Sequence, residues 1–369
     1  MPPPWQNLFA FPTARNSHAD SYIAVIHYYI NVRFLLSTER EMPVSLAVLD
    51  LFHPQIKAAI ETAIPPDWTA RFVEENSLAA RTKLIRDADI VFVMAAPMPK
   101  ELLAEARRLR FIQKLGAGID RIDLDFCRAQ GIGVARLHAG NSVPVAEHTI
   151  LLMLATYRQL PQIDRRTRAG TWSKEDARGM HRSLQHKTVG LVGFGAIGKE
   201  VAKRLRAFDV NLLYYDPIPA PVDVEQSLGV TFAGLDELVR AADIVSLHLP
   251  LLPQTKNIID AKRIAAMKSD AVLINCARGG LVDETALADA LKAGRLFGAG
   301  IDAFSQEPPV GSPLLDLDNT VVTSHLAGAT LDNFANVVAR SVENAKAVLA
   351  GQPLPDSDVA VAPRKVPAS

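Results

Sequence analysis

The sequence has little of several features that mark whole classes of protein. Its 369 residues include two cysteines, Cys127 and Cys276, which cannot by themselves form a disulfide framework or a four-ligand zinc site. Lysine and arginine total 40 and so do aspartate and glutamate, so no long-range field would gather nucleic acid or an anionic membrane. We therefore expect a globular protein of the reducing cytoplasm whose partners are small molecules rather than nucleic acids or membranes.

A long hydrophobic run is also lacking. The fairly apolar stretch at residues 22–36 contains histidine, asparagine and arginine, and it is too short to cross a bilayer and too polar for a signal peptide. We interpret residues 1–43 as a poorly ordered N-terminal extension, or as sequence upstream of a true start at Met42. Deletion of residues 1–41 is expected to leave folding and activity intact.

Short apolar runs alternate with helical stretches from residue 44 onward. This alternation is typical of βα units, in which a parallel sheet is connected by crossover helices. The expected strands are 45–51, 90–94, 111–115 and 133–135, and the expected helices are 54–63, 100–108, 124–130 and 144–158.

A second series follows a polar, arginine-rich stretch. Its expected strands are 188–192, 211–215, 244–247, 271–275, 298–301 and 320–322, and a last helix covers 333–350. Six successive strands with helices between them indicate a second doubly wound sheet. The sequence thus predicts an α/β protein with two doubly wound parallel-sheet domains.

A glycine fingerprint, Gly193-Phe194-Gly195-Ala196-Ile197-Gly198, follows the strand 188–192 and opens a helix. Gly193 permits the tight turn, Gly195 lets the backbone approach a pyrophosphate, and Gly198 lets helix and strand pack closely. The helix N-terminus at Ala196 and Ile197 would face the phosphates with free N–H groups. A lone fingerprint is weak, but this strand-turn-helix context predicts a Rossmann dinucleotide site.

Asp216 ends the next expected strand, where a carboxylate can accept hydrogen bonds from the ribose hydroxyls of adenosine. The same charge would repel a 2′-phosphate, and residues 217–219 offer no arginine to receive one. The cofactor is therefore expected to be NAD or NADH, with NADP less favoured. The alternative is a simple turn aspartate at the strand end.

Three later segments, 275–280, 301–308 and 323–328, contain Arg278, Glu307 and His325. An arginine can clamp a carboxylate, a histidine can move a proton near neutral pH, and a glutamate can keep that histidine charged. Taken singly, each residue could be a surface charge, a solvated loop residue or a structural histidine.

Several ordered segments together resemble the D-isomer-specific 2-hydroxyacid dehydrogenases over about residues 44–352. They are 115–120, 140–142, 145–148, the glycine fingerprint, 248–251 and the three segments above. The resemblance implies that Arg278 binds the substrate carboxylate and keto oxygen, and that His325 protonates the carbonyl oxygen as nicotinamide delivers hydride. Glu307 would hold the imidazole protonated and oriented, so reduction should remain active to a higher pH than a free histidine would allow.

The resemblance also implies a set of contacts around these three residues. Further cofactor contacts would come from His248, Pro250, Ala277 and Asp302, of which Asp302 could instead be a turn aspartate and His248 is uncertain. Substrate contacts would come from Ala95, Gly116, Ala117, Gly118 and Asn141. We interpret Cys276 as a packing residue and His148 as part of helix packing and its polar contacts.

The resemblance divides the chain into a flavodoxin-like substrate domain and a Rossmann NAD-binding domain. Residues 44–143 would begin the substrate domain, 144–328 would form the NAD-binding domain, 329–356 would return to the substrate domain, and 357–369 would be a tail. Family members usually dimerise through the cofactor domain, and the helix 144–158 is apolar enough to lie at such an interface. A homodimer is therefore expected.

The substrate is expected to be a small 2-oxo acid such as glyoxylate or hydroxypyruvate. Residues 93–98 offer no arginine for a phosphate, and the sequence ends soon after its last expected helix, without a regulatory domain. Both points disfavour phosphoglycerate dehydrogenase, which stays an alternative. Formate dehydrogenases pair the histidine with glutamine, so Glu307 speaks against them. The alternative from another class is an NAD-sensing corepressor resembling the C-terminal binding proteins.

Overall fold

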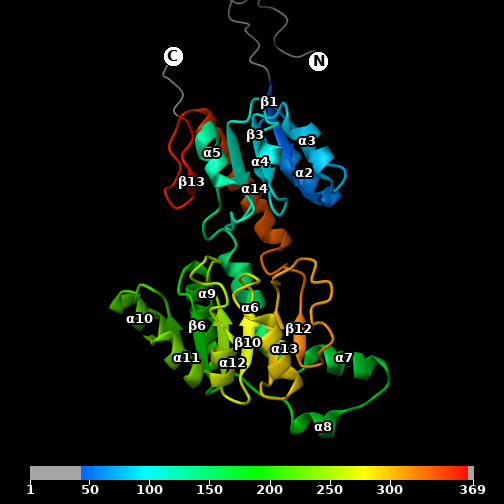
Figure 1. Ribbon diagram of the computed structural model, residues 1–369, viewed down its shortest axis with the longest axis vertical. Coiled ribbons are helices and arrows are strands. Elements are labelled where there is room, and N and C mark those ends of the chain that lie inside the picture. Colours follow the sequence, from blue (N-terminus) through cyan, green and yellow to red (C-terminus); the bar gives the residue numbers. More distant parts are fainter. Residues whose placement is uncertain (1–42, 365–369) are drawn as a thin grey trace, which may run out of the picture. The chain divides into compact units, whose positions relative to one another are not determined.

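The computed structural model describes residues 43–364, which form two β-sheets with helices on both faces. The first sheet has the strand order β13-β5-β4-β3-β1-β2 (Figure 1). Its strands are β1 (Val44–Val48), β2 (Trp68–Phe72), β3 (Ile90–Val93), β4 (Phe111–Lys114), β5 (Gly133–Ala135) and β13 (Val359–Val361). The pairs β1–β3, β3–β4 and β4–β5 are parallel, whereas β13 is antiparallel to β5.

The second sheet has the order β12-β11-β10-β9-β6-β7-β8, and its neighbours all pair in parallel. Its strands are β6 (Thr188–Val192), β7 (Asn211–Tyr215), β8 (Val230–Phe232), β9 (Ile244–Leu247), β10 (Val272–Asn275), β11 (Gly298–Ile301) and β12 (Thr320–Val322). The order reverses between β6 and β9, which is the switch point where open α/β sheets bind ligands.

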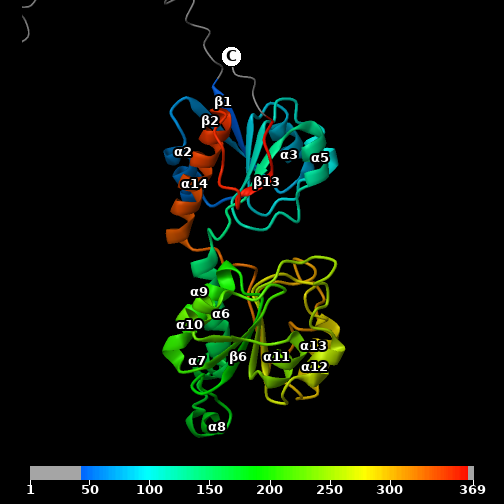
Figure 2. The ribbon, with the colours of Figure 1, turned by 90° about the vertical axis from the view of Figure 1, so that its left-hand side faces the viewer.

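Helices cover both faces of the first sheet (Figure 2). The helices α2 (Pro54–Ala63) and α14 (Leu331–Leu349) pack together on one face, and α3 (Leu78–Ile85) and α5 (Leu124–Gln130) lie on the other, next to α4 (Lys100–Leu103). Because α14 is the last helix among residues 43–364, the segment after β12 returns to the sheet that the N-terminal half begins.

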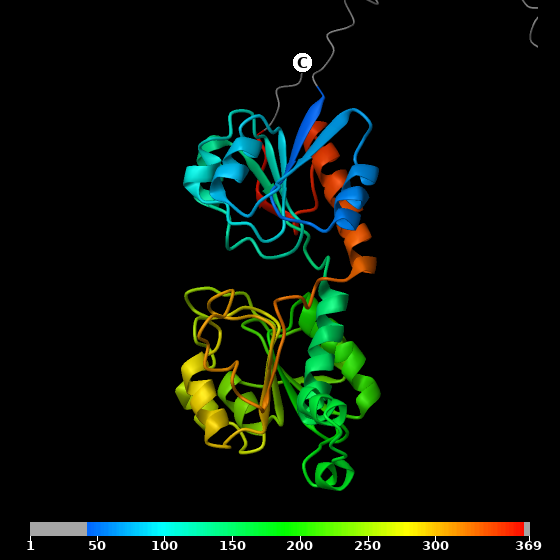
Figure 3. The same cartoon turned by 90° about the vertical axis from the view of Figure 1, so that its right-hand side faces the viewer.

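The second sheet is covered in the same way (Figure 3). One face carries α6 (Ser142–Tyr157), α9 (Ala196–Leu205), which continues into the 3₁₀ turn η1 (Arg206–Phe208), and α10 (Val222–Leu228). The other carries α11 (Leu235–Ala241), α12 (Ala261–Ala266) and α13 (Glu284–Lys292). Two short helices, α7 (Leu160–Arg168) and α8 (Lys174–Arg178), contain no buried residue.

The central strands are largely apolar because helices cover both faces of each sheet. All four residues of β3, β9, β10 and β11 are buried. One core cluster lies between the second sheet and α11 to α13, a second between that sheet and α6 and α9, and a third in the first sheet. The polar side chains at the strand ends therefore project from a rigid base.

The predicted fold class is confirmed: both domains are doubly wound α/β sheets. The structure adds strands β2 and β8 and helices α3, α7 and α8, which the sequence analysis did not identify. The second sheet therefore has seven strands rather than six. The helix expected at 100–108 ends at Leu103, beyond which only turns follow. The proposed extension at 1–43 lies outside the described residues apart from its last position.

The expected tail at 357–369 is wrong over Val359–Val361, because these residues form the edge strand β13. Asp358, which precedes the strand, has a fully buried side chain. It accepts a hydrogen bond from Nη2 of Arg340 at 2.6 Å and another from the backbone N–H of His138 at 3.0 Å. This carboxyl group therefore joins β13, helix α14 and the segment after β5.

Among the described residues, no helix combines the length and the hydropathy that a membrane crossing requires.

Replacement of Asp358 by alanine is expected to lower the free energy of unfolding by about 2 kcal/mol, because Arg340 and the His138 N–H would lose a buried acceptor. Urea denaturation followed by circular dichroism measures this. Asp125→Ala is the matched control, since Asp125 pairs with Arg128 on the exposed surface of α5 and should change stability by less than about 0.5 kcal/mol. Equal effects of the two variants would contradict the structural role of Asp358.

Candidate active site

The predicted site residues of the second sheet follow the carboxyl ends of its strands. Gly193 comes directly after β6, Asp216 after β7 and His248 after β9. Ala277 and Arg278 lie just beyond β10, Asp302 directly follows β11, and His325 lies just beyond β12. Because parallel strands end at the same edge of a sheet, residues scattered over more than 130 positions of sequence are gathered at one edge.

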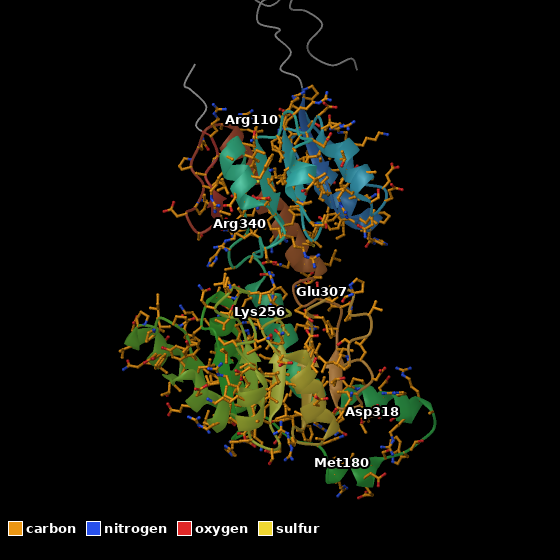
Figure 4. All side chains as sticks on the ribbon, viewed as in Figure 1. Arg110, Met180, Lys256, Glu307, Asp318 and Arg340 are labelled. Atoms are coloured by element: carbon orange, nitrogen blue, oxygen red, sulfur yellow. The ribbon has the colours of Figure 1, made fainter. Side chains whose placement is uncertain are left out.

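His325 and Glu307 form a direct pair. Nδ1 of His325 lies 2.7 Å from Oε1 of Glu307, which is a short hydrogen bond between an imidazole and a carboxyl group. The same oxygen of Glu307 accepts the backbone N–H of Phe304 at 3.3 Å. The pairing leaves Nε2 of the histidine free to face a substrate, and the side chain of His325 is 43% exposed. Glu307 lies in the loop that follows β11 (Figure 4).

Asp302 fixes the segment that carries His325. Its side chain is fully buried and accepts hydrogen bonds from the Thr323 hydroxyl at 2.6 Å and from the backbone N–H groups of Leu326 and Ala327. Its backbone carbonyl accepts the N–H of His325 at 2.8 Å. The structure therefore gives Asp302 a structural function; its predicted contact with the nicotinamide stays a prediction.

His325 itself adopts a left-handed backbone conformation with φ of 53°. This conformation is sterically unfavourable for a histidine, and it persists only where neighbouring interactions hold the backbone in place. The hydrogen bonds that Asp302 accepts from His325 itself and from residues on both sides of it hold this backbone conformation.

Arg278 lies against the glycine turn that follows β4. A Cβ atom on Gly118 would overlap Nη2 of Arg278, so the guanidinium occupies the space that a side chain at 118 would need. Nε of Arg278 is 3.5 Å from Oδ1 of Asp120, and Nη1 donates to the carbonyl of Ala277 at 2.7 Å. The contact brings the predicted substrate turn Gly116–Gly118 next to the predicted carboxylate clamp.

Arg121 is a residue of this site that the sequence analysis missed. Its Nη2 donates to Oε2 of Glu307 at 3.3 Å, and its Nη1 donates to the carbonyl of Ala95 at 3.2 Å. Arg121 thus links the carboxylate beside His325 to the loop after β3. Its sequence signal was its place directly after the motif segment 115–120.

Asp50 and Lys114 were also missed, although both lie where strands end. Asp50 accepts the backbone N–H groups of Met94, Ala95 and Ala96, at 2.5, 2.7 and 2.8 Å, and so fixes the loop that contains the predicted substrate residue Ala95. Lys114 is the last residue of β4 and donates to the carbonyl of Met94. Burial lowers the pKa of Lys114 to about 8.

Asn141, the remaining predicted substrate residue, lies beside the His325 segment. It is the N-cap residue of α6, and its Nδ2 would be 2.9 Å from a Cβ atom on Gly328. Its Oδ1 is buried and has no hydrogen-bond partner among the described residues. A buried acceptor without a partner suits a site that completes its hydrogen bonds with a ligand.

The glycine loop has the geometry that its sequence predicts. Gly193 has φ of +101°, and a Cβ atom there would lie 2.6 Å from the carbonyl oxygen of His248. A Cβ atom on Gly195 would meet nothing within 4 Å, and α9 begins at Ala196, next to Ile197, without a side-chain cap. The first turn of α9 therefore keeps free N–H groups that point into open space, which fits the phosphates of a dinucleotide.

Asp216 is tied to this loop. Its Oδ2 accepts the backbone N–H of Phe194 at 2.9 Å, and its Oδ1 accepts that of Ile218 at 3.2 Å. The ring of Phe194 stacks on Tyr214 with centroids 4.2 Å apart. The carboxyl group thus lies at the mouth of the glycine loop, where the ribose of a bound dinucleotide would be expected.

The other histidines and the cysteine near the site are held inside the fold. Burial lowers the pKa of His248 to about 3, so its ring is neutral at physiological pH, and Nε2 lies 3.0 Å from the Ser246 hydroxyl. Nε2 of His148 lies 3.1 Å from the Thr323 hydroxyl. Burial raises the pKa of the Cys276 thiol to about 12, which fits the predicted packing role. Pro250 follows in the same loop as His248, where its carbonyl accepts the Thr255 hydroxyl.

No group of metal-ligating side chains is found among residues 43–364. The site thus offers proton-transfer and anion-binding groups beside a dinucleotide cradle.

Comparison with known proteins gives consistent matches. Residues 150–327 match the model of the "D-isomer specific 2-hydroxyacid dehydrogenase, NAD binding domain". The chain is 39% identical over 311 residues to D-3-phosphoglycerate dehydrogenase of Methanocaldococcus jannaschii, covering 84% of this chain but only 58% of that relative. It is 35% identical to hydroxypyruvate reductase of Thermotoga maritima, covering 74% of this chain and 88% of the relative.

A solved structure agrees with the sequence matches. D-lactate dehydrogenase of Aquifex aeolicus, complexed with NAD and lactic acid, is 28% identical and aligns with a TM-score of 0.75, covering 86% of this chain and 99% of that one. The chain spans less than two thirds of the length of the phosphoglycerate dehydrogenases that it matches. The fold, the glycine loop and these matches together show that the chain belongs to the D-isomer specific 2-hydroxyacid dehydrogenase family.

Proposed function

We propose that the chain is an NAD-dependent dehydrogenase that transfers hydride between nicotinamide and C2 of a small 2-oxo or 2-hydroxy acid. The observation that carries the proposal is the 2.7 Å pair of His325 and Glu307 at the sheet edge that also bears Arg278 and the glycine loop. An imidazole held by a carboxylate is suited to move a proton near neutral pH.

In the proposed reaction, three side chains and the cofactor each have a defined role. Bound NADH supplies the hydride. Arg278 binds the substrate carboxylate and the carbonyl oxygen with its planar fork, as lysine could not. His325 gives a proton from Nε2 to the carbonyl oxygen during reduction and removes the hydroxyl proton in the reverse direction. Glu307 accepts the N–H of Nδ1 and so fixes the ring orientation.

For the substrate we infer a small 2-oxo acid such as glyoxylate or hydroxypyruvate. The loop after β3 offers no arginine, and the Thermotoga maritima relative is a hydroxypyruvate reductase. A phosphorylated 2-oxo acid is the second candidate, because several relatives are D-3-phosphoglycerate dehydrogenases and because Lys114 adds a cation beside the glycine turn.

Substitution of the proposed catalytic residues tests the reaction. His325→Ala should lower kcat for NADH oxidation with glyoxylate or hydroxypyruvate by about 10²- to 10⁴-fold, because the proton donor is lost. Arg278→Ala should lower kcat/KM for every 2-oxo acid, since all share the carboxylate. Steady-state absorbance at the NADH band measures both.

His186→Ala is a suitable control, since His186 is exposed and lies before the start of β6, at the opposite end of that strand from the glycine loop. NADH binding without turnover across a broad panel of 2-oxo acids would contradict the enzyme and favour an NAD-sensing binding protein.

We also propose that Asp216 sets a preference for NAD over NADP by repelling a 2′-phosphate. Asp216→Asn keeps an acceptor for the Phe194 N–H and removes the charge, so the ratio of the Kd for NADPH to that for NADH should fall about tenfold or more. Fluorescence titration of both cofactors measures the ratio. Asp223→Asn, on the exposed face of α10, is the matched control. An unchanged ratio in Asp216→Asn would refute the assignment.

We propose a homodimer as the assembly. Most of α6 is buried against α9 and the sheet, which leaves Val143 and Leu151 of α6 and Leu160 of α7 as half-exposed apolar residues. Light scattering at micromolar concentration should give twice the 40.1 kDa of one chain. Leu151→Glu should shift the mass toward one chain if this surface forms the interface. A single-chain mass for the unaltered protein would contradict the proposal.

A further inference from the structure

Lys114 places an ammonium group between the two segments that would face the substrate. Its Nζ donates to the carbonyl of Met94, in the loop after β3. On the other side, a Cβ atom on Gly116 would lie 3.6 Å from Nζ, so the ammonium also touches the glycine turn after β4. Arg278 lies against the same turn, at Gly118. A cationic side chain therefore lies against each end of the turn.

None of the described charged groups that face Lys114 forms an ion pair with it. They are Asp50, Asp120, Arg121 and Arg278. The oxygens of Asp50 are taken by three backbone N–H groups, and Asp120 lies 3.5 Å from Arg278. Among the described residues, Lys114 is in no ion pair within 4.0 Å.

The ammonium has three N–H donors, and within residues 43–364 one of them has a hydrogen-bond acceptor. Burial already disfavours its charge, which lowers its pKa to about 8. An anion or a polar oxygen from a ligand would supply the missing acceptor and compensate the lost solvation.

We propose that Lys114 is a specificity-determining residue that hydrogen-bonds an oxygen substituent on C3 of the substrate, a hydroxyl or, more strongly, a phosphate ester. The inference rests on the proposed function, in which Arg278 takes the substrate carboxylate. The second cation, at the other end of the same turn, then serves the far end of the substrate. The absence of arginine from the loop after β3 consequently does not leave this end of the proposed substrate site without positive charge.

A purely structural role for Lys114 predicts a different result. The bond from Lys114 to Met94 could serve only to hold the loop onto β4. In that case removal of the ammonium would lower stability and weaken every ligand to a similar degree. A substrate-binding role requires discrimination between ligands that differ only at C3.

The test is the affinity of three unreactive ligands for the full chain saturated with NADH, measured by calorimetry. D-Lactate, D-glycerate and 3-phospho-D-glycerate carry a methyl, hydroxymethyl and phosphate-ester group at the same position and share the remaining atoms. For Lys114→Met, the affinities for D-glycerate and 3-phospho-D-glycerate relative to D-lactate should fall, about ten- to a hundredfold for the phosphate ester. Lys114→Arg should retain most of the discrimination. Lys100→Met, which removes an exposed lysine at the start of α4, is the control.

The pH profile gives a second readout. Because the free ammonium has a pKa of about 8, the affinity for 3-phospho-D-glycerate should decline as the pH rises through 8, and the affinity for D-lactate should lack this inflection. Arginine stays charged, so Lys114→Arg should abolish the inflection while keeping the affinity. Proton uptake on binding the phosphate ester near pH 8 should accompany the profile.

The outcomes separate this inference from the proposed function. NADH oxidation by glyoxylate in the unaltered protein tests the reaction, whereas the ligand ratios test Lys114 without any turnover. Equal losses for all three ligands in Lys114→Met would overturn the inference, as would an unaltered protein that binds them with equal affinity. If Lys114→Met does not fold, the ligand series on the unaltered protein and on Lys114→Arg still tests the inference.

Discussion

The buried carboxyl group of Asp302 is the interaction on which the geometry of the site depends. It accepts three hydrogen bonds from Thr323, Leu326 and Ala327, and the carbonyl of the same residue accepts the N–H of His325. These bonds hold His325 in a left-handed conformation that an unsupported histidine would avoid. A buried polar group that is fully bonded in this way rigidifies its surroundings, whereas loss of one partner would be costly. The proposed proton donor is therefore positioned by the core of the second sheet.

The rest of the site follows from the architecture of parallel sheets. Strand ends bring the glycine loop, Asp216, Arg278, Asp302 and His325 to one edge, and the loop after β3 and the turn after β4 carry the predicted substrate contacts. Arg121 and Arg278 connect these groups, because Arg121 bonds both Ala95 and Glu307 while Arg278 lies on the turn at Gly118. We propose that this site acts on 2-hydroxy acids and that the residues beside the glycine turn determine which of these acids fit.

Much of this arrangement could be predicted from the sequence, and the failures have physical reasons. The glycine loop, Arg278, Glu307 and His325 were recognised because each belongs to an ordered motif next to an apolar strand. Arg121 was missed because its partner Glu307 is 186 residues away, and Lys114 was missed because it lies within the expected strand 111–115, which in the structure ends at Lys114. Strand β13 has three residues and depends on pairing with distant β5, and α7 has no buried residue and hence no apolar stripe to detect.

The central claim is direct hydride transfer to C2 of a 2-oxo acid, and isotope transfer tests it most directly. NADH deuterated at C4 of the nicotinamide, in each of its two stereoisomers, would be incubated with the protein and hydroxypyruvate, and the glycerate would be analysed by NMR and on a chiral phase. We expect deuterium at C2 of D-glycerate from one of the two stereoisomers. Absence of labelled glycerate, label lost to solvent, or L-glycerate as the product would contradict the account.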